Sequence, residues 1–150
     1  MKRSIRKIWR MLPPAIRLQI VRTTQRKFTV SAAALIRNDS GEVLLLNHVL
    51  RPLSGWGLPG GFVDKGEQPE ETIRREVMEE TGIRLADLSL LRVRTVNKHI
   101  EVLFTAVAAG EPSVMSREIF ELGWFSPGRL PDEMSTAQKT IIKEVFGAVN

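Results

Sequence analysis

The sequence predicts one α/β layered domain that follows a short, basic, helical N-terminal segment. Short runs of β-branched and apolar residues are mixed with two longer stretches of helical periodicity, which favours helices layered on a sheet. A chain of 150 residues with 43% hydrophobic content can bury one sizeable core. Residues 1–27 stand apart, because they hold nine Lys/Arg and no acidic residue. We therefore predict an N-terminal segment over residues 1–27 and one domain over residues 28–150.

The N-terminal segment is predicted to form two short helices separated by Pro13 and Pro14, because proline interrupts a helix. Apolar residues recur at helical spacing in both: Ile5, Ile8, Trp9 and Leu12 in the first, and Ile16, Ile20 and Val21 in the second. These stripes either pack on the domain, with the arginines in solvent, or face an anionic surface. That surface is a membrane or the phosphate backbone of RNA. An Arg-rich, acid-free start is also typical of organelle transit peptides, although serine is scarce here.

The rest of the chain carries 13 Lys/Arg and 17 Asp/Glu, so the formal charge of +5 comes from residues 1–27. This uneven distribution of charge is informative about binding partners and not about the fold. The absence of cysteine excludes disulfides and thiolate metal sites, and it fits a reducing compartment, so we expect a cytoplasmic protein. No apolar stretch reaches transmembrane length, and arginines interrupt any signal-peptide core.

The first two strands are predicted as a hairpin. Phe28 to Ile36 is β-branched and apolar, and Glu42 to His48 follows the turn residues Asn38–Gly41. Residues 51–61 are rich in Pro and Gly and are predicted as a loop. Three further strands are predicted at Ser89–Val96, Ile100–Ala108 and Glu118–Phe125. The last helix follows Ser135, the first residue of a capping-box pattern.

The other long helix is predicted from Pro69 to Thr81. Pro69 suits a first helical turn because its missing N–H has no partner there in any case. Gly82 suits the left-handed residue that commonly ends a helix. Ile73 and Val77 lie four positions apart, so they can seat this helix on a sheet.

The same helix carries a face of carboxylates. Glu76, Glu79 and Glu80 stand at i, i+3 and i+4, and their mutual repulsion is relieved by a hard divalent cation such as Mg²⁺ or Mn²⁺. Arg75 precedes Glu79 by four positions and can hold that carboxylate. Ahead of the helix, the bare backbone of Leu58–Gly61 can approach a metal or a phosphate closely. The spacing predicts metal-assisted phosphoanhydride hydrolysis. The alternative is a surface helix with a solvated Glu/Arg face.

Residues Gly61 to Ile83 match the pattern G-x5-E-x7-R-E-U-x-E-E-x-G-U, in which U is apolar, at every specified position. A chance match at a given start is on the order of one in a billion for average residue frequencies. The segment resembles the signature box of the Nudix hydrolases, and the resemblance extends from about Phe28 through the last helix. It implies an α/β/α sandwich with a mixed β-sheet.

The resemblance also implies roles for single residues. The metal ligands would be Glu76, Glu79 and Glu80, helped by the carbonyl of Gly61. Arg75 would orient Glu79, and Glu67 would brace the loop or reach a second metal.

The attacking water in this family is activated by a box glutamate or by a carboxylate outside the box. We take Glu121 as the outside candidate in preference to Glu118. The alternative for Glu121 is a strand glutamate that faces water.

Substrate contacts are predicted for Arg37, Arg51 and Phe62, which can also be ordinary surface arginines and a core aromatic. His48 and His99 have no metal-ligand spacing and are predicted to be structural. The chain has no tyrosine and no zinc-ribbon cysteines, so the subfamily features that depend on them are absent.

The sequence therefore predicts a metal-dependent pyrophosphohydrolase that uses Mg²⁺, or Mn²⁺, and takes a small-molecule nucleotide. The bond cleaved is a phosphoanhydride in a nucleoside diphosphate linked to another moiety. The alternative is a nucleotide-sensing or RNA-associated module of the same fold with little or no hydrolysis. The sequence does not decide between a monomer and a homo-oligomer.

Overall fold

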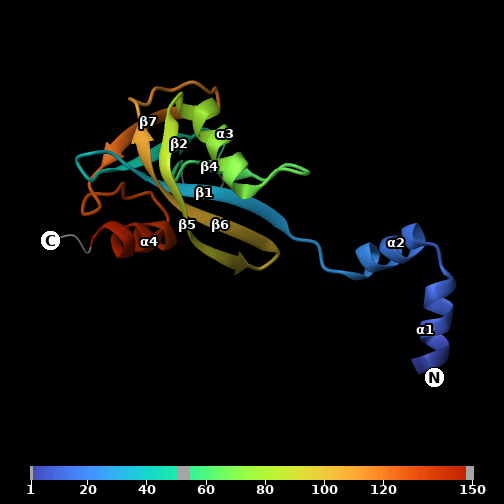
Figure 1. Cartoon of the computed structure of the whole chain (residues 1–150). Helices are drawn as coiled ribbons and strands as arrows, with labels where there is room; N and C mark the ends of the chain where they lie inside the picture. Colours follow the sequence, from blue (N-terminus) through green and yellow to red (C-terminus); the bar gives the residue numbers. More distant parts are fainter. Residues whose placement is uncertain (1, 51–54, 148–150) are drawn as a thin grey trace.

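A computed structural model describes residues 2–50 and 55–147 of the chain. The helices are α1 (Lys2–Met11), α2 (Pro14–Thr24), α3 (Pro69–Thr81) and α4 (Thr136–Phe146). The strands are β1 (Thr29–Arg37), β2 (Val43–His48), β3 (Trp56–Gly57), β4 (Gly60–Phe62), β5 (Arg84–Val96), β6 (His99–Ala109) and β7 (Ile119–Phe125). Figure 1 shows the domain formed by β1 to α4, with α1 and α2 reaching away from it.

One mixed sheet of seven strands forms the centre of the domain. The strand order is β3-β2-β1-β6-β5, with β4 paired to β1 and β7 paired to β2. β1 and β6 run parallel, from Thr29 opposite His99 to Arg37 opposite Val107. β1 pairs antiparallel with β2 and β4, and β5 pairs antiparallel with β6, so both orientations occur in one sheet.

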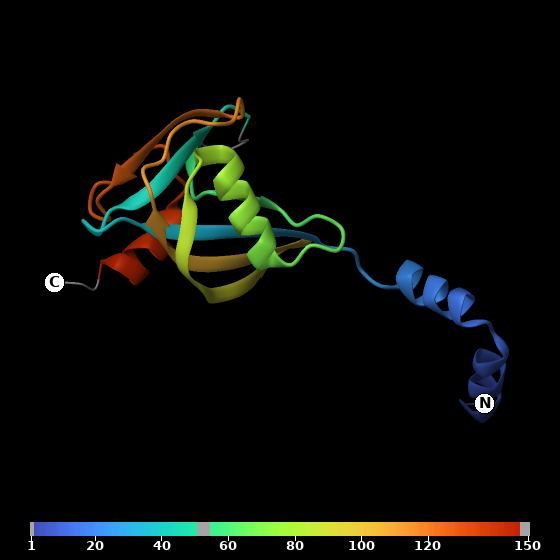
Figure 2. The same cartoon turned by 45° about the horizontal axis from the view of Figure 1, so that its top comes forward.

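A helix covers each face of this sheet, as the alternation of side chains along β1 requires. Ala32, Ala34 and Ile36 belong to the buried cluster that includes Ile73 and Val77 of α3. Ala33 and Leu35, which point the other way, belong to the cluster that includes Ile141 and Ile142 of α4. The predicted α/β/α sandwich with a mixed sheet is confirmed, and the turned view in Figure 2 shows α3 lying across the strands.

Two predictions of secondary structure differ from the observed elements. The segment 51–61 was predicted as loop throughout, but its described part contains β3 and the start of β4. Glycine has little intrinsic strand preference, so Gly60 and Gly61 give no strand signal in the sequence. β5 begins at Arg84, five residues before the predicted start, because its register shifts between Ala86 and Ser89 and this irregularity breaks the alternation.

The two N-terminal helices form as predicted, yet they do not pack on the domain. Neither α1 nor α2 contains a buried residue. Both views show these helices leading away from the sheet, joined to β1 by a short connection (Figures 1 and 2). Within residues 2–50 and 55–147, no helix combines the length and the apolar character needed to cross a bilayer.

Candidate active site

Helix α3 has the ends that its sequence predicts. The backbone N–H of Gln68 donates to the Glu71 carboxylate at 2.8 Å, which closes one half of a capping box at the N-terminus. At the other end Gly82 has φ +75°, and its N–H donates to the carbonyl of Met78 at 2.9 Å. Ile73 and Val77 are buried against the sheet, and the acidic face of α3 runs beside them, from the buried Glu80 to the exposed Glu79.

An open cleft of about 680 Å³ lies beside this acidic face. It is lined by His48, Val49, Leu50, Gly60, Gly61, Phe62, Asp64, Arg75, Glu76, Glu80, Arg117 and Glu118. The lining residues come from the end of β2, from β4, from α3 and from the segment before β7. The cleft therefore brings box residues together with chain segments far from the box in sequence.

Arg75 is the centre of the charged network in this cleft. Its Nε donates to Glu67 Oε1 at 2.8 Å and its Nη2 to Glu67 Oε2 at 3.0 Å, which is a bidentate pair. Its Nη1 donates to Glu76 Oε1 at 2.8 Å and reaches Glu79 Oε2 only at 3.5 Å. Arg75 therefore holds Glu67 and Glu76 more closely than Glu79, the partner that the spacing predicts.

Glu67 ties the loop before α3 to the helix. Thr72 Oγ1 donates to its Oε2 at 2.7 Å, and the N–H of Asp64 donates to the same oxygen at 3.3 Å. The Arg75 guanidinium, followed by the Thr72 hydroxyl, lowers the pKa of Glu67 from 4.5 to about 2. The same pairing raises the pKa of Arg75. These contacts are those of a residue that braces the loop, one of the two roles expected for Glu67.

We expect Glu67→Gln to destabilise the metal-free domain in a pH-dependent way. The folded-state pKa lies below the unfolded value, so the ionised carboxylate stabilises the fold above pH 4.5 and this contribution is lost as the pH falls toward 2. Thermal unfolding followed by circular dichroism in the presence of chelator measures the difference between the two proteins. The melting temperatures should differ most above pH 5 and converge on acidification. A difference that stays constant from neutral pH to pH 2 would contradict the Arg75–Glu67 pairing.

Gly60 and Gly61 let β4 lie against β1 at the floor of the cleft. Gly61 pairs with Ala32, and Gly60 pairs with Ala33. Gly60 has φ +146°, and a Cβ there would lie 2.7 Å from the Cα of Ala33. A Cβ on Gly61 would overlap the Glu76 carboxylate. The absence of a side chain at Gly60 lets β4 approach β1, and its absence at Gly61 gives Glu76 its room beside the backbone.

The three box carboxylates differ in their surroundings. Glu80 is buried, with an exposed fraction of 6%, and Glu76 is partly buried at the cleft wall. The Glu79 side chain is 59% exposed and does not line the cleft. Among residues 2–50 and 55–147, no three His or acidic side chains converge closely enough to enclose a metal ion.

The donor set nevertheless fits a hard divalent cation. Glu76 and Glu80 bring carboxylate oxygens to the cleft, and the space at Gly61 that a Cβ would fill lies against the Glu76 carboxylate. Glu79 is exposed on the same helix face, so a change of side-chain rotamer can bring it toward Glu76 and Glu80.

His48 belongs to the site, although the sequence gives no signal for it. Its Nδ1 lies 3.8 Å from Glu80 Oε1, and both side chains are largely buried. His48 ends β2, and Glu80 lies near the end of α3, so only the packing of α3 on the sheet brings them together. The prediction that His48 has a structural role does not account for its position in the cleft wall.

Of the two carboxylates outside the box, the structure brings Glu118 to the cleft and not Glu121. Glu118 lines the cleft beside Arg117. Glu121 lies on β7 opposite Asn47 and accepts a hydrogen bond from Asn47 Nδ2 at 3.0 Å.

The predicted substrate residues are dispersed. Phe62 lies at the cleft edge with an exposed fraction of 64%, and its ring meets the His99 ring edge-on at 5.9 Å. Arg37 ends β1 and lines a separate hollow with Gly41 and Phe146, away from the box. Arg51 lies outside the described residues.

A second, smaller hollow of about 170 Å³ adjoins the cleft at Gly60, Gly61 and Phe62. Its polar groups are Ser31, His99, Glu101 and Gln138. His99 accepts or donates hydrogen bonds with Ser31 at 2.8 Å and Thr29 at 2.7 Å, so its ring is fixed between β1 and β6. The site thus has a charged part at the box and a polar part on the other side of Phe62.

Comparison with known proteins shows the family of this chain. The family model described as NUDIX domain matches residues 27–145. A protein of Bacillus subtilis named "Putative 8-oxo-dGTP diphosphatase" is 35% identical over 120 residues, which cover 78% of this chain and 79% of that protein.

Solved structures give the same result. The crystal structure of a MutT NUDIX hydrolase from Burkholderia pseudomallei aligns with a TM-score of 0.71 at 32% identity, covering 80% of this chain and 99% of that one. The NUDIX domain of Shewanella oneidensis NrtR, solved with ADP ribose, aligns with a TM-score of 0.75 at 20% identity, covering 93% of this chain and 100% of that one, which is a likeness of fold alone. With the box, the sandwich and these matches together, the chain belongs to the Nudix family of hydrolases, which act on phosphoanhydride bonds.

Proposed function

We propose that this chain is a metal-dependent pyrophosphohydrolase that cleaves a phosphoanhydride bond in a nucleoside diphosphate linked to another moiety. The observation that carries the proposal is the cleft in which box carboxylates and Arg75 face a bare glycine backbone. The family membership and the Bacillus subtilis relative support the same reaction class.

In this proposal Glu76, Glu79, Glu80 and the carbonyl of Gly61 hold Mg²⁺ or Mn²⁺. Such a cation, when bound, neutralises phosphate charge so that water can attack phosphorus. Arg75 and Glu67 set the positions of the carboxylates, since Arg75 contacts Glu76 at 2.8 Å and forms the bidentate pair with Glu67.

The opposite wall of the cleft supplies the remaining groups. Arg117 can pair with a phosphate oxygen, because a guanidinium presents two parallel donors to such a group. Glu118 is our candidate for the carboxylate that orients or deprotonates the attacking water, in place of Glu121, because Glu118 lines the cleft. Glu80, next to His48, is the box alternative for that role.

The nucleobase is proposed to lie at Phe62 and in the adjoining hollow. Phe62 offers an exposed ring face for stacking, and Ser31, Glu101 and Gln138 offer donors and acceptors for base edges. Substrate would then extend from the hollow, past Phe62, to the carboxylates of α3.

Hydrolysis of a nucleotide panel with Mg²⁺ and with Mn²⁺ tests the proposal. The panel holds NTPs, 8-oxo-dGTP, ADP-ribose, NADH, nucleotide sugars, diadenosine polyphosphates and 5′-triphosphorylated RNA, and the Glu79→Gln protein serves as blank. We expect metal-dependent product release from one preferred substrate and none from the blank. The identity of the products gives the bond cleaved.

A sensor is the competing interpretation. Nucleotide binding with no product across the panel would overturn the proposal and favour a nucleotide-sensing module. The complete set of box glutamates is evidence against the sensor interpretation, since a protein that only binds nucleotide does not need all three.

A further inference from the structure

We propose that α1 is a peripheral membrane anchor, which lies in the interface of an anionic lipid bilayer and recruits the domain to that surface. The proposal concerns a part of the chain that shares no residue with the cleft. It is independent of which nucleotide the cleft takes.

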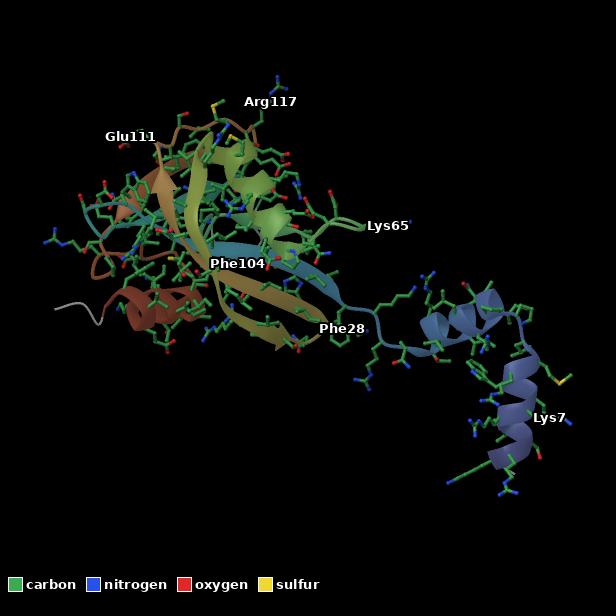
Figure 3. The ribbon with its side chains drawn as sticks, in the orientation of Figure 1. Lys7, Phe28, Lys65, Phe104, Glu111 and Arg117 are labelled. Atoms are coloured by element: carbon green, nitrogen blue, oxygen red, sulfur yellow. The ribbon has the colours of Figure 1, made fainter. Side chains whose placement is uncertain are left out.

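The two sides of α1 have opposite character. Ile5, Ile8 and Trp9 recur at i, i+3 and i+4, so they lie along one side of the helix. The basic residues Arg3, Arg6, Lys7 and Arg10 line one shallow surface hollow and thus share a side. Figure 3 shows Lys7 pointing from α1 into solvent. A short helix with an apolar side and a Lys/Arg side is the pattern of interfacial helices.

The apolar side of α1 is open to a partner. Ile5 is 61% exposed, Ile8 is 63% exposed, and α1 contributes no buried residue to the domain. At ten residues the helix is roughly 15 Å long, about half the thickness of the hydrocarbon core. It can therefore lie in a bilayer surface but cannot cross the bilayer.

The charge of the chain favours an anionic surface and orients the domain on it. Residues 1–27 hold nine Lys/Arg and no acidic residue, whereas residues 28–150 hold 13 Lys/Arg and 17 Asp/Glu. Anionic lipid attracts the first part and repels the second. The connection Gln25–Phe28 separates α2 from β1, so the N-terminal helices can lie on the surface while the domain stays farther from it.

A lipid surface also fits better than the two other occupants. A nucleic-acid backbone would neutralise the basic side but leave Ile5 and Ile8 in water. A second copy of α1 could cover them, but it would bring two acid-free basic segments together. A bilayer interface satisfies both sides of the helix at once. The apolar stripe predicted for the second helix does not give α2 such a division, because Leu18 is exposed on the side away from Ile16 and Ile20, so α1 is the anchoring element.

Binding of the full chain to vesicles tests the proposal. Sedimentation with phosphatidylcholine–phosphatidylglycerol vesicles should pellet the protein, and phosphatidylcholine vesicles alone should not. Ile5→Ser/Ile8→Ser keeps every charge and should weaken binding at least about tenfold, because it removes two large exposed apolar side chains from the side that enters the bilayer. Lys7→Glu/Arg10→Glu should weaken it by a similar factor. The matched control, Lys98→Glu/Lys143→Glu, makes the same charge change at exposed positions of the domain and should bind like the unmodified chain.

Two further readouts identify the mode of binding. Trp9 fluorescence should shift to the blue with anionic vesicles, and Trp9→Phe should remove that shift. Anisotropy with a fluorescent single-stranded RNA and the elution volume on gel filtration report the other occupants. The proposal is overturned if anionic vesicles do not pellet the chain, or if Ile5→Ser/Ile8→Ser binds them as well as the unmodified protein. It is also overturned if RNA or a second copy binds through α1 while vesicles do not.

Discussion

Glu79→Gln and Glu80→Gln are each expected to lower kcat by on the order of a thousandfold or more while the fold persists. The amide keeps the size of the side chain but removes the negative charge that a divalent cation requires. Glu79 is mostly exposed, so its replacement should leave the melting temperature nearly unchanged. Glu80 is buried beside His48, and its amide should shift stability by a small amount compared with the loss of turnover. Steady-state kinetics with the preferred nucleotide and thermal unfolding measure the two quantities.

Glu70→Gln is the matched control for this pair. Glu70 is exposed in the first turn of α3, so the same chemical change on the same helix should preserve turnover. Full activity in both Glu79→Gln and Glu80→Gln would contradict the proposal that these carboxylates hold the catalytic metal.

The same assay compares Glu118→Gln with Glu121→Gln, and we expect the larger loss of turnover for Glu118→Gln because only Glu118 lines the cleft.

The sequence predicts the part of the site that a single helix, α3, provides. Pro69 and Gly82 fix the ends of α3, and its period places Glu76, Glu79 and Glu80 together along one face, next to the buried Ile73 and Val77. These are local relations within 3.6-residue turns, so they can be read without knowing the tertiary structure. The apolar run of β1 predicts a strand by similar local reasoning, whereas the helix that covers each of its faces is seen only in the structure.

The remainder of the site depends on pairings between distant segments. The register of β2 on β7 shifts between Asn47 and His48, so Asn47 lies opposite Glu121 and His48 opposite Ile119. A shift of this kind changes which side chains share a face, and alternation along β7 cannot reveal it. The sequence alone therefore does not decide between Glu121 and Glu118, and it does not reveal the contact of His48 with Glu80. Arg75 favours Glu67 over Glu79 for a related reason, since the loop fold decides how near Glu67 comes.

Gly60→Ala is expected to lower the free energy of unfolding by roughly 3 kcal/mol, which corresponds to a fall of about 10 °C in Tm. Two costs combine at this position. The backbone has φ +146°, which an L side chain rarely adopts, and the added Cβ would meet the Ala32 carbonyl and lie 2.7 Å from Ala33 Cα. Those atoms belong to the backbone of β1 in the middle of the sheet, so they cannot move aside as a flexible side chain can.

Gly41→Ala separates these two costs. Gly41 lies in the turn between β1 and β2 with φ +76°, and a Cβ there would meet nothing within 4 Å. Its substitution should cost only the conformational strain, about 1 kcal/mol. If Gly60→Ala and Gly41→Ala destabilise equally in urea unfolding, the close approach of β4 to β1 is refuted. If Gly60→Ala is the more costly, its turnover should fall as well, because β4 carries Gly61 and Phe62 at the floor and edge of the cleft. The same backbone contact then supports both the stability of the sheet and the space in which Glu76 acts.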